Sequence, residues 1–448
     1  MVQKVNSKRK KKSYVPLYFL LIMILIAGLL VAIYFKNEYS EIIEIKSDIT
    51  KVNNLTDKDE TIDTTFLKAI LPDADSGVQV INISRSTNLP EFEYDEDAGK
   101  YIRRVYSGRR INIAVTGVDA RLGDRYRHAD ANHIISILPD NGKIEIISIP
   151  RDTPADAGYD DTTGQNKLTI VRAAKGRRAY FEELCRIGEV DKIHYFAELG
   201  FSQAMGIIEW LGYEKPSQTL QILRSRSALG GDDFQRVYNQ GQFIRQMLFR
   251  NFSRLDGMMG DIFIGSGLML VESDLTSSKI KEIIQLLKAN GFDSSPDNIT
   301  VKIRPSFPAK FKLYDFTDEG TVKSLSIVVK NYYTEKSDND DDGNVESSSD
   351  NSEKVFSRLT NVLSKAETDS SSSPQKVINN LSTFFEQRAW LQIEDKEKRL
   401  EVRDRFVELM TKAYEKRKDT LSANKVRGVA IAEDNLLYQK KMQTNNNQ

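Results

Sequence analysis

Residues 111–152 read INIAVTGVDARLGDRYRHADANHIISILPDNGKIEIISIPRD. This stretch holds three short apolar runs with the length and β-branched composition of buried strands. The predicted strands are Ile111–Thr116, His133–Leu138 and Lys143–Ile149. Asn141-Gly142 between the second and third strands is a strong hairpin signal, so these two strands should pair antiparallel in the sheet of an α/β domain.

The predicted hairpin gathers polar residues at one edge of the sheet. If Asn-Gly is a two-residue loop, position 138 faces 145 and 132 faces 151, which places Asp130 near Arg151. If the first strand runs parallel to the third, Asp119 and Arg121 leave the sheet at the same edge. Open α/β sheets bind ligands at such edges, so we expect a site here.

The residue types at this edge suit a phosphate and a metal ion. Asp119 and Asp130 could hold Mg²⁺ through oxygen ligands, with substrate phosphates completing its shell. Arg151 and the other guanidinium groups could bind phosphate oxygens in pairs. The alternative interpretation is that these residues are solvated loop charges joined in surface salt bridges.

A second basic cluster follows downstream. Leu220–Arg226 has the alternation of a strand and would place Arg224 and Arg226 on one face. Asp232 or Asp233 can then cap a helix through Phe234 to about Phe252, on which Arg236 and Gln240 share a face. Clustered arginines favour a bound anion. The alternative is that they neutralise Asp232, Asp233 and Glu209.

Composition excludes several classes of protein. Among 448 residues, Lys+Arg and Asp+Glu both number 64, which argues against a dedicated nucleic-acid binder. The one cysteine, Cys185, allows no intrachain disulfide. With three histidines in all, a structural zinc site is not expected.

The N-terminal region predicts a membrane anchor. Tyr14–Phe35 has no charged residue, and as a helix its 22 residues span about 33 Å, enough to cross a bilayer. A basic segment precedes it, so the positive-inside rule predicts a single-pass type II protein in the cell membrane with its catalytic domain outside the cytoplasm. A cleaved signal peptide is disfavoured, because the run is long and no small-residue cleavage site follows.

The rest of the chain divides by composition. We expect a cytoplasmic tail at 1–13, the anchor at 14–35, a stalk or accessory region at 36–104, the catalytic domain at 105–333, a disordered linker at 334–374, and a C-terminal helical region and tail at 375–448. The linker is expected because 334–374 is rich in Ser, Asp, Asn and Glu. The C-terminal helices could recruit a protein partner.

These residues together resemble one known family, the LytR-CpsA-Psr phosphotransferases. The resemblance covers about residues 111–250. It is carried by Gly117-x-Asp119-x-Arg121, Asp130, Ile149-Pro150-Arg151-Asp152-Thr153, Lys167-Leu168, Leu211-Gly212, Arg224-Ser225-Arg226, Gly231-Asp232 and Arg236-x-x-x-Gln240. The Ser-Ile-Pro-Arg-Asp-Thr and Arg-Ser-Arg strings are its most specific parts.

The resemblance implies an α/β/α sandwich with a mixed central sheet and a Mg²⁺-dependent enzyme. Members move a glycopolymer phosphate from a polyprenyl-pyrophosphate carrier to peptidoglycan or another envelope acceptor. Catalytic roles would fall to Asp119, Arg121, Asp130 and Arg151, with both aspartates at the metal. The pyrophosphate would be bound by Arg151, Lys167, Arg224, Arg226, Arg236 and Gln240.

The chain departs from the family pattern at three points. His128-Ala129-Asp130 stands where the family has Arg-Ser-Asp, so Arg127 or His128 would replace that arginine. Asn239 replaces the second arginine of Arg-x-x-Arg-Gln-Gln, and the segment from Gly212 to Arg224 is short. Two other functions remain open: a polyprenyl-pyrophosphate hydrolase, and a non-catalytic envelope-binding scaffold.

Overall fold

The computed structural model describes residues 79–83, 92–95, 100–106, 108–119, 122–124, 127–255, 257–292, 295–306, 310–337, 348–369 and 373–446. The predicted anchor, Tyr14–Phe35, and the cytoplasmic tail lie outside these residues. Within the described part of the chain, no helix is both long and apolar enough to cross a membrane. In the predicted accessory region, β1 (Gln79–Ile83), β2 (Phe92–Asp95) and β3 (Lys100–Tyr106) form a small sheet in the order β1-β3-β2.

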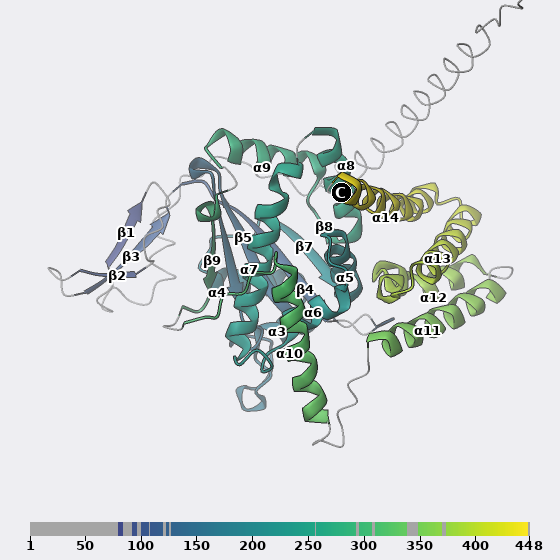
Figure 1. Cartoon of the computed structure of the whole chain (residues 1–448), viewed down its shortest axis with the longest axis horizontal. Helices are drawn as coiled ribbons and strands as arrows, with labels where there is room; N and C mark the ends of the chain where they lie inside the picture. The colour runs from purple at the N-terminus through teal and green to yellow at the C-terminus, as the bar shows by residue number, and fades with distance from the viewer. Residues whose placement is uncertain are drawn as a thin grey trace, which may run out of the picture. The chain divides into compact units, whose positions relative to one another are not determined.

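The site is built on a mixed six-stranded sheet in the order β8-β7-β4-β5-β6-β9 (Figure 1). Its strands are β4 (Ile111–Asp119), β5 (His128–Leu138), β6 (Lys143–Ile149), β7 (Tyr195–Gly200), β8 (Glu272–Ser273) and β9 (Ile299–Ile303). The β4–β5 and β5–β6 pairs are antiparallel, so β4 and β6 run in the same direction. The prediction that their carboxyl ends share an edge is therefore confirmed.

Alternating side chains of these strands feed two separate cores. Ile113 and Ile146 face one core with α8 (Gly257–Leu270) and α9 (Ser277–Ala289), whereas Ala114 and Ile147 face the other with α4 (Gly176–Gly188). A sheet with both faces apolar must be covered on both sides. The α/β fold with a mixed central sheet is therefore confirmed.

Helix α7 (Asp233–Asn251) crosses the sheet closely and begins as predicted, with the Asp232 carboxylate accepting backbone N–H bonds. A Cβ atom at Gly241 would lie 2.6 Å from Ser148 Oγ, so only glycine lets the helix approach β6 this far. The approach brings Arg236 and Gln240, on the same helix, close to the strands.

The predicted hairpin register was wrong by two residues. Leu138 pairs with Lys143, and Asn132 pairs with Ile149. The connection is not a two-residue loop: Pro139–Asn141 forms one 3-10 turn that Gly142 ends in the left-handed conformation, with φ 58°. Proline favours the first position of such a turn, and that preference outweighs the Asn-Gly signal.

The remaining catalytic-domain helices are α3 (Leu168–Ala174), α5 (Phe201–Trp210), α6 (Pro216–Arg224) and α10 (Glu319–Ser337). Short 3-10 turns are η3 (Asp161–Thr163), η4 (Phe252–Leu255) and η5 (Pro296–Asn298). Helix α9 is capped by the Thr276 hydroxyl, which accepts the backbone N–H of Lys279.

The prediction of a linker without structure was wrong for Ser348–Asp369, which forms helix α11. Its buried residues Val355, Leu359, Leu363 and Ala366 recur at intervals of three and four, so one face packs although the composition is polar. With α12 (Pro374–Glu386), η6 (Ala389–Gln392), α13 (Lys396–Lys416) and α14 (Thr420–Asn446), it builds a core around the fully buried Trp390. We call residues 348–446 the C-terminal helical region.

Candidate active site

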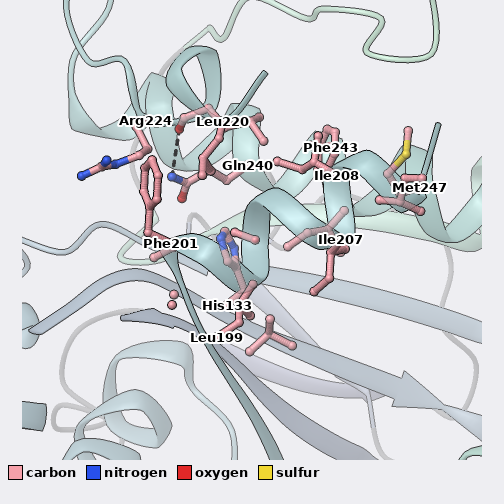
Figure 2. Close-up of a pocket in the computed structure, with 18 of the residues that line it drawn as sticks. His133, Leu199, Phe201, Ile207, Ile208, Leu220, Arg224, Gln240, Phe243 and Met247 are labelled. Carbon is pink, nitrogen blue, oxygen red and sulfur yellow. Dashed lines mark hydrogen bonds between the residues drawn. The ribbon is translucent and has the colours of Figure 1, made fainter. Parts of the chain in front are cut away.

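A cavity of about 390 Å³ lies between the sheet and helices α5, α6 and α7. At one end it is lined by Asp119, Asp130, Arg224, Arg236 and Gln240. Its walls are apolar and come from Leu199, Phe201, Ile207, Ile208, Leu220, Leu223, Phe243, Met247 and Phe263, among others. Figure 2 shows Arg224 and Phe201 at one end and Met247 at the other. The cavity therefore joins a charged end to an apolar interior.

The charged end centres on Asp130. Arg151 donates a hydrogen bond from Nη1 to Asp130 Oδ1 over 2.7 Å, and the Thr169 hydroxyl donates to the same oxygen over 3.4 Å. Burial opposes the charge of Arg151, but Asp130 and Asp152 raise its pKa above the ordinary value. The predicted closeness of Asp130 and Arg151 is thus confirmed, although the register that led to it was not.

Three arginines meet around two further carboxylates. Arg226 lies 3.3 Å from both Asp152 Oδ2 and Asp233 Oδ1, and Arg236 Nη2 lies 2.6 Å from Asp233 Oδ1. We call Arg151, Arg226 and Arg236 the arginine cluster. Asp233 partly neutralises it, as the alternative interpretation expected. Glu209 does not, since it pairs with Arg399 of the C-terminal helical region.

The arginine cluster and Asp233 hold buried polar atoms that have no hydrogen-bond partner in the described chain, among them both carboxylate oxygens of Asp233. The Nε atoms of Arg151 and Arg236 are both buried, and no residue of the described chain accepts a hydrogen bond from either. Burial, reinforced by Arg226 and Arg151, lowers the pKa of Arg236 although Asp233 opposes the shift. Unsatisfied buried donors are costly, and phosphate oxygens are acceptors that could satisfy them.

Arg224 approaches the cavity from another element. The predicted strand at Leu220–Arg226 was wrong: Pro216–Arg224 is helix α6, which begins with proline at its first turn. The Arg224 guanidinium lies over the Phe201 ring, 5.1 Å from its centroid. Helical spacing turns Leu220 and Leu223 into the cavity, so the short segment after Gly212 still supplies an apolar wall.

Two predicted residues take supporting positions. Lys167 Nζ lies 3.5 Å from Asp152 Oδ1, beside the arginine cluster but not in the cavity lining. Gln240 lines the cavity and donates from Nε2 to the Leu223 carbonyl over 3.0 Å (Figure 2), while its buried Oε1 accepts no hydrogen bond within the described chain. Arg121 lies outside the described residues.

His133 is a site residue that the sequence did not single out. It lines the cavity, and its Nδ1 lies 2.8 Å from Ser148 Oγ on β6. Burial lowers the pKa of His133 to about 4, so the ring is neutral near neutral pH. A neutral ring adds no charge beside Arg236, which suits a polar support for α7.

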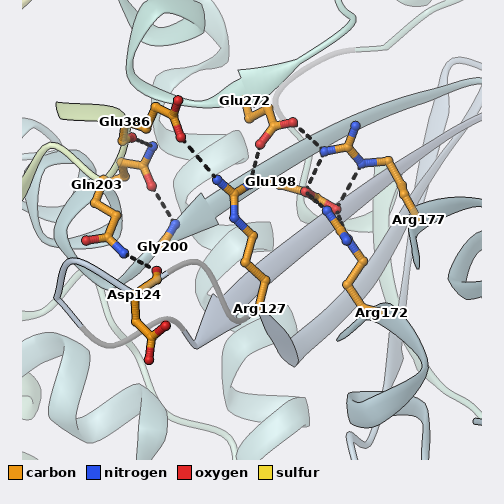
Figure 3. A network of polar contacts seen from close by, with 10 residues as sticks. Asp124, Arg127, Arg172, Arg177, Glu198, Gly200, Gln203, Glu272 and Glu386 are labelled. Atoms are coloured by element: carbon orange, nitrogen blue, oxygen red, sulfur yellow. Dashed lines mark hydrogen bonds and ion pairs between the residues drawn. The ribbon is translucent and has the colours of Figure 1, made fainter. Parts of the chain in front are cut away.

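A buried ion-pair network also escaped sequence reasoning. Glu198 on β7 accepts two hydrogen bonds each from Arg172 and Arg177 (Figure 3). Burial opposes ionisation, but these arginines hold the pKa of Glu198 at about 2. Arg127 pairs with Glu272 at 2.5 Å, so it belongs to this network and does not take the place of the missing family arginine.

Asp119 and Asp130 fit a magnesium site of the kind that substrate completes. Both line the charged end of the cavity and offer hard oxygen ligands. Among the described residues, no group of three or more His, Cys, Asp or Glu side chains is arranged to hold a metal ion alone. Mg²⁺ is commonly held by one or two carboxylates together with substrate phosphates, which matches this donor set.

Part of this chain is similar in sequence or in structure to known proteins. Residues 82–212 match the LytR_cpsA_psr family model. No curated protein matches the chain in sequence. Among solved structures, B. subtilis TagV is 15% identical with a TM-score of 0.36 and covers 50% of this chain and 98% of its own. "TagT bound to LIIa-WTA" is 15% identical with a TM-score of 0.34 and covers 50% and 90%.

A third similar structure is protein gbs0355 from Streptococcus agalactiae, which is 14% identical with a TM-score of 0.35 and covers 44% of this chain and 77% of its own. The family match spans Asp119, Asp130, Arg151 and Lys167 and ends before α6 and α7, which carry the remaining arginines. Residues 82–212 of this chain are therefore similar to the LytR-CpsA-Psr family.

Proposed function

We propose that this protein is a membrane-anchored phosphotransferase of the cell envelope. It would move a glycopolymer phosphate from a polyprenyl-pyrophosphate carrier to peptidoglycan or another envelope acceptor, with its catalytic domain outside the cytoplasm. One observation carries the proposal: two carboxylates and the buried Arg236, which has donors without an acceptor in the described chain, line the same cavity as many apolar side chains. A lipid pyrophosphate has the same two-part chemistry.

The charged end would bind and orient the pyrophosphate. Arg151 and Arg236 each have a buried N–H without an acceptor in the described chain, and phosphate oxygens would satisfy both. Arg224 lies over the Phe201 ring, lines the same cavity, and would add a further guanidinium for the anion. Phosphoryl transfer depends mainly on positioning and charge stabilisation, so such a clamp supplies most of what the reaction needs.

Asp119 and Asp130 would hold Mg²⁺ together with phosphate oxygens, and the ion would neutralise phosphate charge when bound. Either aspartate could accept the proton of the acceptor hydroxyl. Arg151 bonds one oxygen of Asp130 and so leaves the other available for these roles.

The apolar walls would bind the polyprenyl chain. Side chains from α5, α6 and α7 enclose the interior, and burying isoprenoid carbons there contributes about 25 cal/mol per Å². The interior excludes water from one side of the reacting phosphate. This arrangement supports a lipid-linked donor more than a soluble nucleotide.

The test uses the full chain in detergent with Mg²⁺, a short-chain polyprenyl-pyrophosphate oligosaccharide and a peptidoglycan fragment. Release of polyprenyl phosphate and attachment of glycan to the acceptor are followed together. We expect both in the wild type and a loss of at least about 100-fold in Asp130→Asn and Arg151→Ala. Asp156→Asn and Arg178→Ala are matched controls, because both residues are exposed and distant from the cavity lining.

The outcomes separate the candidate functions. Release without attachment, even with acceptor present, would identify a hydrolase. No release and no donor binding would reject the enzyme and favour an envelope-binding scaffold.

A further inference from the structure

The C-terminal helical region contacts two elements that form the candidate active site. Leu122, in the connection between Asp119 and Asp130, packs against the core of this region, as does Met269 of α8. Helix α5, which walls the cavity, is also contacted by side chains of η6 and α13, and its Gln203 donates to the Glu386 carbonyl of α12. Apolar packing and polar contacts therefore both connect the C-terminal helical region to the elements around the cavity.

Gln387 binds the connection between the two aspartates at both of its amide atoms. Its Oε1 accepts the Gly123 N–H over 2.8 Å, and its Nε2 donates to the Asp124 carbonyl over 2.9 Å. One side chain thus fixes the backbone donor of Gly123 and the backbone acceptor of the next residue, Asp124. A planar amide held at both ends constrains orientation as well as distance.

The Phe384 ring of α12 packs against the same connection. Gly123 has φ +78°, and a Cβ atom there would lie 2.5 Å from Cζ of Phe384. Glycine is the residue that adopts this φ without strain. The backbone at 123 is therefore determined twice, by its own conformation and by contact with α12.

Arg127 ties the far side of this connection to the same helix. It lies 3.8 Å from a Glu386 carboxylate oxygen and 2.5 Å from one of Glu272 (Figure 3). Asp130 follows three residues later on β5, and Asp119 precedes Gly123 by four residues on β4. Contacts from α12 thus act on both sides of the segment that separates the carboxylates.

Helix α5 is held on the face opposite the cavity. Gln392 donates to the Ser202 hydroxyl over 2.7 Å, and a Cβ at Gly206 would lie 2.8 Å from a Leu391 methyl carbon. Arg399 forms an ion pair with Glu209 one turn later. The cavity wall and the carboxylate connection therefore share one support.

We infer that Gln387 is a positioning residue for the proposed transfer, through which the C-terminal helical region sets the placement of Asp119 and Asp130. This inference rests on the proposed function. Gln387 is absent from the cavity lining, so it acts through the backbone of Gly123 and Asp124. Displacing reacting groups by about 1 Å can slow an enzyme about 100-fold, so losing the two hydrogen bonds of Gln387 should have a large effect on rate.

The experiment compares three variants of the full chain with the wild type in the transfer assay. Gln387→Ala removes both hydrogen bonds to the connection. Gln387→Glu keeps the acceptor for the Gly123 N–H but loses the donor to the Asp124 carbonyl. Gln375→Ala is the matched control, because Gln375 lies on α12, which Gln387 caps, and is exposed and bonds Asn379. For each we would measure kcat, KM for the lipid donor, binding of inorganic pyrophosphate, and Tm.

We expect Gln387→Ala to lower kcat about tenfold or more, with Gln387→Glu intermediate and Gln375→Ala unchanged. KM and pyrophosphate binding should stay near wild type, because the arginine cluster lies on other elements. A wild-type kcat in Gln387→Ala would overturn the inference. So would a parallel loss of pyrophosphate binding and Tm, which would show a merely structural role. If the wild type itself shows no turnover, the proposed function fails, and the positioning role with it.

Discussion

Arg236 Nη2 lies 2.6 Å from Asp233 Oδ1, yet neither atom makes an aligned hydrogen bond within the described chain. The Arg236 side chain is only 6% exposed, so water cannot compensate. Arg151 and Arg226 add like charge nearby and lower the pKa of Arg236 after burial itself. This corner of the cavity therefore keeps buried guanidinium donors that phosphate oxygens could satisfy.

Inorganic pyrophosphate should stabilise the protein without any lipid. At about 100 times its Kd, a ligand of the folded state adds about 2.7 kcal/mol to the free energy of unfolding, which scanning calorimetry detects as a higher Tm. Arg236→Met should remove most of this shift, whereas Arg178→Met, at an exposed arginine, should keep it. An equal shift in both variants would place the anion elsewhere.

Narrowing the cavity should affect the lipid and spare the pyrophosphate. Ala204 lines the cavity on α5, and Ala204→Leu would occupy part of its space. We expect KM for a long-chain donor to rise about tenfold, while a donor with a short isoprenoid and the pyrophosphate-induced rise in Tm change little. Equal effects on both donors would show that the polyprenyl chain binds outside the cavity. Overpacking typically costs about 1–3 kcal/mol, so Tm is measured in parallel.

Stability should fall as pH rises through the titration of Glu433. Burial raises the pKa of this residue to about 7, although Arg403, Arg388 and the Trp390 N–H oppose the shift. Between the unfolded and the folded pKa of Glu433, the folded state binds more protons than the unfolded state. The stability that this difference contributes is therefore complete below the unfolded pKa and is lost as the pH rises through the folded pKa. We expect Glu433→Gln to flatten the decline in unfolding free energy between about pH 5 and about pH 8.

The control for this pH dependence is Glu408→Gln, since Glu408 is exposed and pairs with Lys412 on α13. Its profile should keep the wild-type decline. An unchanged profile in Glu433→Gln would mean that this carboxyl does not govern the pH dependence.

Helix α11 should contribute strongly to the C-terminal helical region despite its polar composition. Leu359 is fully buried there, and Leu359→Ala should lower the free energy of unfolding by about 2–5 kcal/mol. Asn361→Ala, at an exposed position of the same helix, should cost little. Urea denaturation with Trp390 fluorescence would report the difference. Equal free energies of unfolding for the two variants would contradict a packing role for residues 348–369 and favour a linker.

The sequence predicted the strands and the edge at which they place charged residues, because long apolar runs depend mainly on burial. Asp119 and Asp130 reach one cavity through strand direction alone. The hairpin register could not be counted correctly, because Pro139 starts a 3-10 turn that adds two residues to the connection. The prediction survived because the observed register, continued past Asn132 and Ile149, brings position 130 opposite 151.

The second half of the site was harder to predict. LQILRSR alternates like a strand, but Pro216 starts a helix whose periodicity also places Leu220 and Leu223 on one face. A segment this short fits the periodicity of a strand and also that of a helix, and tertiary packing decides which of the two forms. The contacts of Gln387 and Glu198 join residues far apart in the chain, and no local pattern encodes them.

The glycine beneath the Phe384 ring has an evolutionary consequence. Gly123 has a left-handed φ, and the Phe384 ring leaves no room there for a Cβ atom. At Gly206, the Leu391 side chain leaves no room for a Cβ atom. Both glycines are constrained by side chains of a region that lies beyond the family match. Related chains that carry a similar C-terminal region should therefore keep these glycines, whereas relatives without it should be free to vary them, so that the two parts of the chain evolve as one unit.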